Sequence, residues 1–437
     1  MIYWQKVKLV KEAILTNIIL KNFLSSISTR IVNTVLTLLS TPILLLHLGQ
    51  TGYGFIVLIQ GIVGFGGILD LGLNQSLVRA IAGASAEEKE SIYSTAIRIF
   101  LCIILAFTCM TFLFWDKLIN YLSSLGLVLE NIDSVLLCLM LSCILKVISN
   151  FFGAIMYAEE QIHEVNFAQV VGSVTRLGLF IVMSIYQFSI ESVLYALPLS
   201  FISTIVLQKK GWVSIKSYNH DAYSNTVLRN LVYHASTLFL TQAFGEITLN
   251  ADKLIVTSIL GLKALAPYNI AYLLVARLND LGSIVASVVF PRINANIKNN
   301  EIDDGWAMYS KAQYYTFMLA LPLALFMNIF GPQIVTWWIN EQTSIQVNSI
   351  LLLFSLGAIL SLPNWLNGNM LIIFGQTEKV LFSMVVGALI ALVLCYKLTT
   401  LYGLWGAVAA WSISYILVAC VQFWLVYKFC NEKYYVD

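Results

Sequence analysis

Seven cationic side chains stand inside apolar stretches that are long enough to cross a membrane, and four of them are the first candidates to line a cavity. These four are Arg30, Lys146, Arg176 and Arg277. A charge at the centre of a bilayer costs at least ~2.5–3.5 kcal/mol on insertion scales, so each of these cations needs a partner or an aqueous cavity. An excess of cations around a cavity favours an anionic ligand, and arginine suits phosphate because its planar fork donates two hydrogen bonds at once. The pattern therefore predicts a site for an anionic substrate.

The surroundings of these cations differ between the two halves of the chain. The N-terminal stretches hold the cations Arg30, Arg98, Lys146 and Arg176, and the acid set against them is Asp70, near the inner end of one stretch. Arg277 stands three residues before Asp280, a spacing that would also suit an ordinary ion pair within one helix. The cations could therefore line a substrate cavity or could be structural charges that stabilise helices.

A second group of ionisable residues lies in the C-terminal half and mixes both signs. It consists of Glu246, Asp252, Lys253 and Asp280. Helical spacing places Glu246 on one face with Asn250 and Lys253. A carboxylate in a span can carry a proton or bind a cation, so Glu246 is the first candidate for ion coupling. The alternative is that the group pairs charges between the two halves.

A third group stands close to the predicted inner ends of spans. Its members are Asp70, Arg79, Arg98 and Lys311, and they are the candidates for a cytoplasmic gate. The simpler interpretation is that Asp70 and Arg79 lock an inner loop. Arg98 and Lys311 are close enough to the surface for their long side chains to reach water.

The composition of the chain is that of a membrane protein. The chain has 437 residues, of which 59% are hydrophobic and 11% are charged; its mean hydropathy is +0.81. Soluble domains average about 25% charged residues, which excludes that class. The apolar runs are continuous, whereas a membrane β-barrel would show short alternating segments. The sequence thus predicts an all-α polytopic protein that folds in a lipid bilayer.

Twelve stretches approach the ~20 residues that a spanning helix needs. They are residues 22–46, 52–72, 92–114, 132–156, 165–186, 190–208, 232–258, 265–290, 308–330, 346–373, 380–397 and 403–427. We expect two six-helix lobes, 1–210 and 232–437, around a central cavity, joined by a cytoplasmic linker at 211–231. The longest loops are expected near 209–231 and 292–306.

Basic residues orient these predicted spans. If the N-terminus is cytoplasmic, the inner side holds 15 of the 25 Lys and Arg residues, the outer side holds 3 and the spans hold 7. Basic residues concentrate on the cytoplasmic side of membrane proteins, so both termini are predicted to be cytoplasmic.

A weak internal repeat links the two halves. Gly49 and Gly261 each follow a leucine and precede a span, and Arg79 and Arg292 each close the segment. A short inner loop with glutamine and glutamate, at Gln161 and again at Gln376, precedes the fifth span of each half. Six spans per half give the halves the same orientation, which is a transporter architecture.

Enzymatic motifs are lacking in the sequence. The four histidines are scattered without metal-ligand spacing, and there is no glycine-rich phosphate loop and no nucleophile elbow. We therefore expect neither catalytic residues nor a metal, and neither a cofactor nor a nucleic-acid partner.

Two stretches carry a family resemblance. LGQTGYGFIVLIQGIVGFGGILDLGLNQSLVRAIA resembles the first hairpin of Wzx-type O-antigen and polysaccharide flippases of the multidrug/oligosaccharidyl-lipid/polysaccharide (MOP) exporter superfamily. NADKLIVTSILGLKALAPYNIAYLLVARLNDLGSIVASVVFPRI resembles the seventh and eighth helices of the same family, including the Asp252–Lys253 pair. The likeness extends in layout over nearly the whole chain.

The resemblance implies two lobes in a V, as in MATE transporters, in the bacterial inner membrane. It implies that a polyprenyl-diphosphate-linked oligosaccharide moves from the cytoplasmic to the periplasmic leaflet by alternating access. Coupling to H⁺ or Na⁺ and contacts with other polysaccharide-assembly membrane proteins are also implied. Two alternatives remain at this stage, a multidrug exporter of the same superfamily and a membrane-embedded glycan polymerase or ligase.

Overall fold

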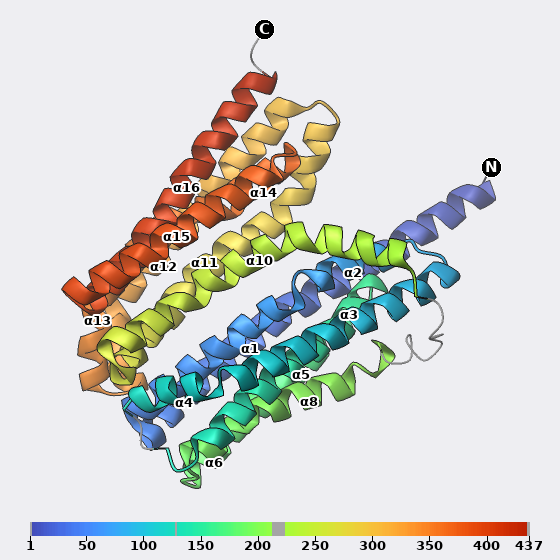
Figure 1. Cartoon of the computed structure of the whole chain (residues 1–437). Helices are drawn as coiled ribbons and strands as arrows, with labels where there is room; N and C mark the ends of the chain where they lie inside the picture. Colours follow the sequence, from blue (N-terminus) through green and yellow to red (C-terminus); the bar gives the residue numbers. More distant parts are fainter. Residues whose placement is uncertain (1, 127–128, 212–222, 435–437) are drawn as a thin grey trace. The chain divides into compact units, whose positions relative to one another are not determined.

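The computed structural model describes residues 2–126, 129–211 and 223–434, with side chains outside the description at 2–24, 86, 237 and 431–434. The described part is helical throughout (Figure 1). The first elements are α1 (Ile2–Phe65), the 3₁₀-helix η1 (Gly66–Asp70), α2 (Leu73–Ile81), α3 (Ala86–Leu113), α4 (Trp115–Ser124), α5 (Ile132–Ala158), α6 (Ile162–Ile185), α7 (Ile190–Leu194) and α8 (Ala196–Leu207). The later elements are α10 (Asn225–Leu260), α11 (Leu262–Lys298), α12 (Ile302–Trp338), α13 (Glu341–Ser361), α14 (Pro363–Ile373), α15 (Thr377–Tyr402) and α16 (Leu404–Tyr434).

Ten helical segments of the described chain are long and apolar enough to cross a membrane. One of them, Ser25–Asp70, has 46 residues and is interrupted at Gly49, where the backbone is not helical. At ~1.5 Å per residue its two parts together would measure about 69 Å, which is more than twice a ~30 Å hydrocarbon core. Helix α10 has 36 residues but carries four charges, at Arg229, Glu246, Asp252 and Lys253, and is not among the ten. The predicted count of twelve therefore stays a prediction.

Helix boundaries follow local chemistry. Helix α3 begins with a capping box in which the Ser85 hydroxyl accepts from the Glu88 N–H at 3.3 Å and the Glu88 carboxylate accepts from the Ser85 N–H at 2.8 Å. Helix α13 is capped by Asn340, whose Oδ1 accepts from the Thr343 N–H at 2.8 Å. The loop expected at 292–306 is wrong, because α11 continues through Pro291 to Lys298 and α12 begins at Ile302.

The chain forms two compact units with interleaved sequence. Unit 1 comprises residues 1–49 and 65–242, and unit 2 comprises residues 50–64 and 243–437. These units depart from the predicted lobes at 50–64 and at 232–242. The first departure arises because Tyr53 and Gly54 pack against α11, where a Cβ at Gly54 would collide with the carbonyl of Leu262 and the Tyr53 hydroxyl accepts from Asn269 at 3.0 Å.

The second departure arises in the first part of α10. Leu231 and Ala235 belong to the apolar core of unit 1, which is built on α2, α3 and α5, and the Ser76 hydroxyl donates to the Leu231 carbonyl at 2.9 Å. Helix α10 also begins at Asn225, inside the range predicted as a linker, while linker residues 212–222 lie outside the described residues.

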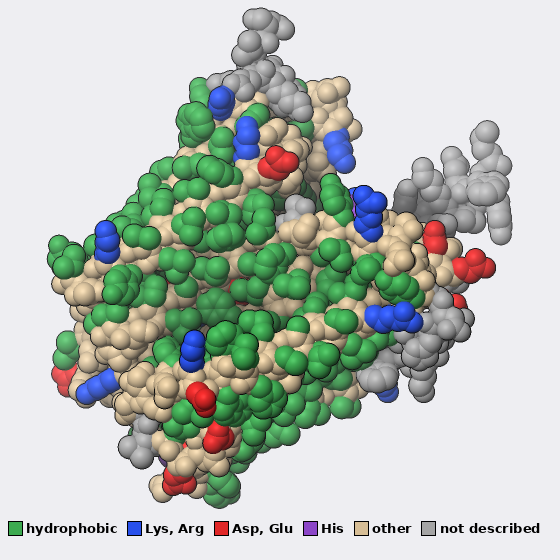
Figure 2. All heavy atoms as spheres, in the orientation of Figure 1, with side chains coloured by type: hydrophobic (Ala, Val, Ile, Leu, Met, Phe, Trp, Pro, Cys, Tyr) green, Lys and Arg blue, Asp and Glu red, His purple; other side chains and the backbone are tan. Residues whose placement is uncertain are grey.

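Unit 1 packs around one central helix, and unit 2 packs around two. In unit 1, α5 contacts α2, α3, α6 and α8. In unit 2, α11 contacts α12, α13 and α14, and α16 contacts α13, α14 and α15. The apolar side chains that this packing leaves outside are large and numerous: Leu39, Leu105 and Trp337 are 61%, 65% and 89% exposed. Figure 2 shows hydrophobic side chains over most of the visible face, as expected for a surface that meets lipid.

The predicted internal repeat appears in the backbone conformation. Gly49 (φ 66°, ψ 179°) and Gly261 (φ 81°, ψ 171°) adopt nearly the same dihedral angles, in a region that is essentially restricted to glycine. The turns before α6 and α15 also match. Gln161 N–H donates to the Met156 carbonyl at 2.9 Å, and Gln376 N–H donates to the Leu371 carbonyl at 2.8 Å. Both are the six-to-one bond of a Schellman turn, with a left-handed residue just before it.

Candidate functional site

A polar cavity of about 250 Å³ lies within unit 1, among η1, α2, α5, α6, α8 and α10. We call it the amide pocket because six of its lining residues are asparagine or glutamine. The lining consists of Asp70, Asn74, Gln75, Val78, Ser149, Asn150, Gly153, Ala154, Tyr157, Val165, Gln169, Gln208 and Gln242. Asp70 is the single charged residue of this lining, and no lysine or arginine contributes to it.

Asp70 is held in the wall of the amide pocket by a break in the helix. The 3₁₀-helix η1 ends at Asp70, and the next two residues, Leu71 and Gly72, are left-handed. The Asp70 carboxylate is 2% exposed and accepts hydrogen bonds from Gly72 N–H at 2.9 Å, from Gln242 at 3.4 Å and from Asn74. It is also close enough to Lys146 for the two charges to interact. The carboxylate is therefore satisfied within unit 1, and its predicted role in a gate stays a prediction.

Two of the glutamines of the pocket are held by their neighbours. Gln242 Nε2 donates to the Gly67 carbonyl at 2.6 Å, and Gln208, 1% exposed, accepts from the Ser149 hydroxyl at 3.3 Å. Asn74 keeps one buried oxygen, Oδ1, without a hydrogen-bond partner in the described structure. The pocket thus has ordered polar walls with hydrogen-bonding capacity to spare.

The predicted cations of unit 1 lie on three helices and outside the amide pocket. Arg30 on α1 is exposed, and Lys146 on α5 and Arg176 on α6 are half-buried. The Nε of Arg176 is buried and has no hydrogen-bond partner among the described residues. Arg277 lies in unit 2, and its guanidinium is 3.0 Å from the Asp280 carboxylate. It has an acidic partner on its own helix, whereas the described ion pairs of unit 1 do not involve Arg176.

The second half of α10 carries a hydrogen-bonded chain on one face. The Asn250 amide donates to Glu246 Oε2 at 2.9 Å, and its oxygen accepts from Lys253 Nζ at 3.0 Å. Lys253 also donates to the Leu249 carbonyl at 3.0 Å and lies 5.5 Å from the centre of the Tyr272 ring. The amide group thus connects the acid and the base that the sequence placed on this face.

Asp252 lies on another side of the same helix and is buried in unit 2. Its Oδ2 accepts from the Tyr268 hydroxyl at 2.6 Å, and its Oδ1 accepts from the Lys253 N–H at 2.8 Å. Asp252 is 8% exposed and Tyr268 is fully buried. A cavity of about 20 Å³ beside them offers room for roughly one water molecule.

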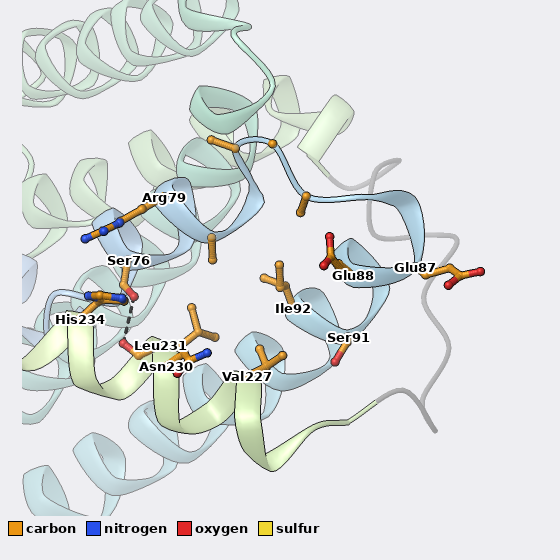
Figure 3. A pocket seen from close by; sticks show the side chains of 14 residues that line it. Ser76, Arg79, Glu87, Glu88, Ser91, Ile92, Val227, Asn230, Leu231 and His234 are labelled. Carbon is orange, nitrogen blue, oxygen red and sulfur yellow. Dashed lines mark hydrogen bonds between the residues drawn. The ribbon is translucent and has the colours of Figure 1, made fainter.

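The predicted gate residues Arg79 and Lys311 line two larger pockets, one in each unit. The first, of about 620 Å³, lies between α2, the start of α3 and the start of α10. Figure 3 shows Arg79 pointing toward His234, while Glu87 points outward. The second, of about 590 Å³, lies between α11 and α12 and contains Arg292 and Lys311. Arg79 and Arg292 are the pair matched by the sequence repeat. Arg98 lies on α3, 4.8 Å from the centre of the Tyr223 ring.

Residues 19–297 match the family described as polysaccharide biosynthesis protein. The match covers well over half of the chain. The chain belongs to this family.

Relatives and solved structures extend the comparison. A Shigella flexneri protein named "Putative O-antigen transporter" is 22% identical over 428 residues, covering 94% of this chain and 99% of that protein. The fold is similar to that of the lipid II flippase MurJ in an inward closed conformation (TM-score 0.76, 17% identity, 92% and 87% of the chains). It is also similar to an inward-facing multidrug resistance MATE family transporter of the MOP superfamily (TM-score 0.73, 19% identity, 91% and 95%).

These findings confirm the predicted family and fold class. They agree with the prediction that the chain is not an enzyme, because the relatives are named as transporters and flippases. Within the described residues, no group of three or more His, Cys, Asp or Glu side chains could hold a metal ion.

Sequence reasoning missed the amide pocket as a unit. It did not single out Asn150, Tyr157, Gln169 or Gln208. A search for charges in apolar stretches passes over neutral amides, because they are cheaper to bury. Their recurrence on α2, α5, α6 and α10 and at the end of α8 is the signal that could have revealed the pocket.

Proposed function

We propose that this family member is a flippase that moves a polyprenyl-diphosphate-linked oligosaccharide from the cytoplasmic to the periplasmic leaflet of the bacterial inner membrane. Membership of the polysaccharide biosynthesis family supports this proposal, as does the end-to-end match to a protein named for O-antigen transport. The similarity of the fold to a lipid II flippase is compatible with alternating access.

The observation that carries the proposal is the environment of Arg176. Its buried Nε has no partner among the described residues, and an unpaired polar group in an apolar environment costs about 1–3 kcal/mol, more when it is charged. A diphosphate would supply acceptor oxygens and countercharge together. In this proposal Arg176, Arg30 and Lys146 bind the diphosphate.

Arg30 is suited to the first contact with the substrate. It is exposed on α1. In the predicted span 22–46, which starts on the cytoplasmic side, residue 30 falls in the inner half, where a lipid-linked substrate would enter. Transfer from Arg30 to the more buried Arg176 would move the diphosphate deeper into the protein, and the negative charge of the diphosphate would stay paired with an arginine. We further propose that Glu246 couples the movement to a flux of H⁺ or Na⁺.

A multidrug exporter is the second candidate, since one of the similar structures is a MATE transporter. Cationic drugs would prefer a cavity lined by acids. The intramembrane cations of unit 1 therefore argue against a drug exporter. A glycan polymerase or ligase is disfavoured by the lack of a predicted large outer loop for sugar chemistry.

The test uses purified protein in vesicles with a polyprenyl-diphosphate oligosaccharide. Arg30→Lys and Arg176→Lys keep the charge but lose the paired hydrogen bonds of the guanidinium. A hydrogen bond to a charged group contributes about 1.5–3 kcal/mol, so we expect roughly tenfold to hundredfold weaker binding of the lipid. Alanine at either position should nearly abolish transfer to the outer leaflet.

Lys209→Ala is the matched control, because Lys209 is an exposed cation of unit 1 outside the predicted spans. It should transfer the lipid at the wild-type rate. If the arginine variants accumulate normally and still transfer the lipid, the proposed site is wrong. If they fail to accumulate, the cations are structural.

A further inference from the structure

The amide pocket has a chemistry unlike that of the cations assigned to the diphosphate. Six neutral amides, the Ser149 hydroxyl and the Tyr157 hydroxyl surround one carboxylate that is already hydrogen-bonded. Each amide both donates and accepts hydrogen bonds. The pocket therefore matches a ligand that also presents both kinds of group from several sides.

The lining excludes the other common ligand classes. A phosphate group would face the Asp70 carboxylate, and no lysine or arginine lines the pocket to pair with it. Lys146, outside the lining, already interacts with Asp70. An apolar ligand would leave the amides without partners, at a cost of about 1–3 kcal/mol for each buried group. A neutral ring that carries several hydroxyl groups satisfies the walls, because each hydroxyl donates one hydrogen bond and accepts two.

The volume sets the size of the ligand. At about 250 Å³, the pocket is smaller than the ~300–1,000 Å³ of sites for drug-sized molecules, so it suits one ring rather than an oligosaccharide. Gly153 helps to keep this space open. Only Gln208 Nε2, at 3.4 Å, and Val165 Cγ1, at 3.7 Å, would lie near a Cβ there, and a longer side chain at this position would occupy the pocket.

Spare hydrogen-bonding capacity points in the same direction. Asn74 Oδ1 is buried and has no hydrogen-bond partner among the described residues, although Asn74 Nδ2 donates to Asp70. This arrangement aims an acceptor oxygen at a fixed position. Buried polar groups of this kind are normally satisfied in proteins, and a sugar hydroxyl would satisfy this one.

We propose that the amide pocket binds one neutral sugar ring of the lipid-linked glycan and selects it by hydrogen bonds to its hydroxyl groups. The proposal rests on the proposed function for the identity of the substrate. It assigns the two parts of that substrate to different groups of unit 1, the diphosphate to the cations and one sugar to the amides.

The test measures binding to purified protein in lipid nanodiscs with two sets of probes. The first compares polyprenyl diphosphate without sugar with the same lipid carrying one glucose, galactose or N-acetylglucosamine. The second contains the corresponding methyl glycosides, which lack both lipid and diphosphate. Wild-type protein should bind one sugar-bearing lipid more tightly than the bare lipid and should prefer the same sugar among the glycosides.

Two variants remove this preference in different ways. Asn150→Leu replaces an amide of the wall with an apolar group of similar size, and Gly153→Leu fills the space. Each should reduce the preference for the sugar-bearing lipid roughly two- to tenfold, as expected for the loss of one neutral hydrogen bond or more. Both should leave the affinity for the bare lipid unchanged. Gly178→Leu is the control, because no atom lies within 4 Å of a Cβ at that position on α6.

The outcomes separate this inference from the proposed function. Thermal unfolding first shows whether both variants are folded, and Asn150→Ser replaces Asn150→Leu if the latter does not fold. If the folded variants keep the wild-type preference for the sugar-bearing lipid, the pocket is only a water-filled polar cavity and the inference is overturned. If wild-type protein shows no preference among the sugars, the inference is also overturned. If the glycoside preference is lost in the variants while wild-type protein moves no lipid, the pocket is supported and the proposed function fails.

Discussion

At the scale of single residues, Glu246 stands out because the Asn250 amide connects its carboxylate to the Lys253 ammonium by two hydrogen bonds. Asn250 donates to Glu246 at 2.9 Å and accepts from Lys253 at 3.0 Å, so proton uptake by the carboxylate would change the hydrogen bonding of the lysine. Asp252, in contrast, is fixed by Tyr268 in a nearly dry environment. Glu246 is half-buried and is the more accessible of the two acids.

Glu246→Gln tests ion coupling at this residue. Glutamine keeps an oxygen that accepts from Asn250, so the fold should be retained, but it cannot take up a proton or carry a charge. We expect transport in vesicles to lose its dependence on an imposed ion gradient. Glu341→Gln, an exposed acid in the first turn of α13, should behave as wild type. An unaltered gradient dependence in Glu246→Gln would remove this residue from the mechanism.

At the scale of elements, the breaks between helices were easier to predict than the ends of the helices. Gly49 and Gly261 were predicted as equivalent turns, and both adopt the extended conformation with positive φ that glycine alone tolerates well. The predicted loop at 292–306 was wrong, since Pro291 lies inside α11. Proline is a weak stop signal in membrane helices, because neighbouring groups can satisfy the freed carbonyl.

Alanine at Gly49 or at Gly261 tests this explanation. No atom of the described residues lies within 4 Å of a Cβ at either position, so we expect a loss of stability to come from backbone strain. We expect each variant to lose about 1–3 kcal/mol of the free energy of unfolding, measured by thermal unfolding in detergent. Gly178→Ala has the same open space but lies inside α6 with no positive φ, and it should be neutral or slightly stabilising. Equal effects in all three variants would contradict the explanation.

At the scale of the whole molecule, hydropathy and residue pattern predicted the family and the helical membrane fold. They could not predict that residues 50–64 pack with unit 2 and that residues 225–242 pack with unit 1. This assignment of segments to units depends on close contacts such as that of Gly54 with the Leu262 carbonyl. The periodicity of apolar residues in the sequence does not indicate such contacts. The amide pocket was missed for a related reason, since it unites neutral residues as distant as Asn74 and Gln242.

The orientation of the chain in the membrane is the remaining prediction at this scale. The 15-to-3 distribution of basic residues between the predicted sides places Gly211, at the end of the first six spans, in the cytoplasm. It places Asn340, between α12 and α13, in the periplasm. A reporter that is active only in the cytoplasm should be active after Gly211 and silent after Asn340, and a periplasmic reporter should give the reverse pattern. The two sites control for each other, because an odd number of spans separates them in the twelve-span topology. Equal activity of one reporter at both sites would mean that a span between them is miscounted, and the long α10, with its four charges, would be the first helix to re-examine.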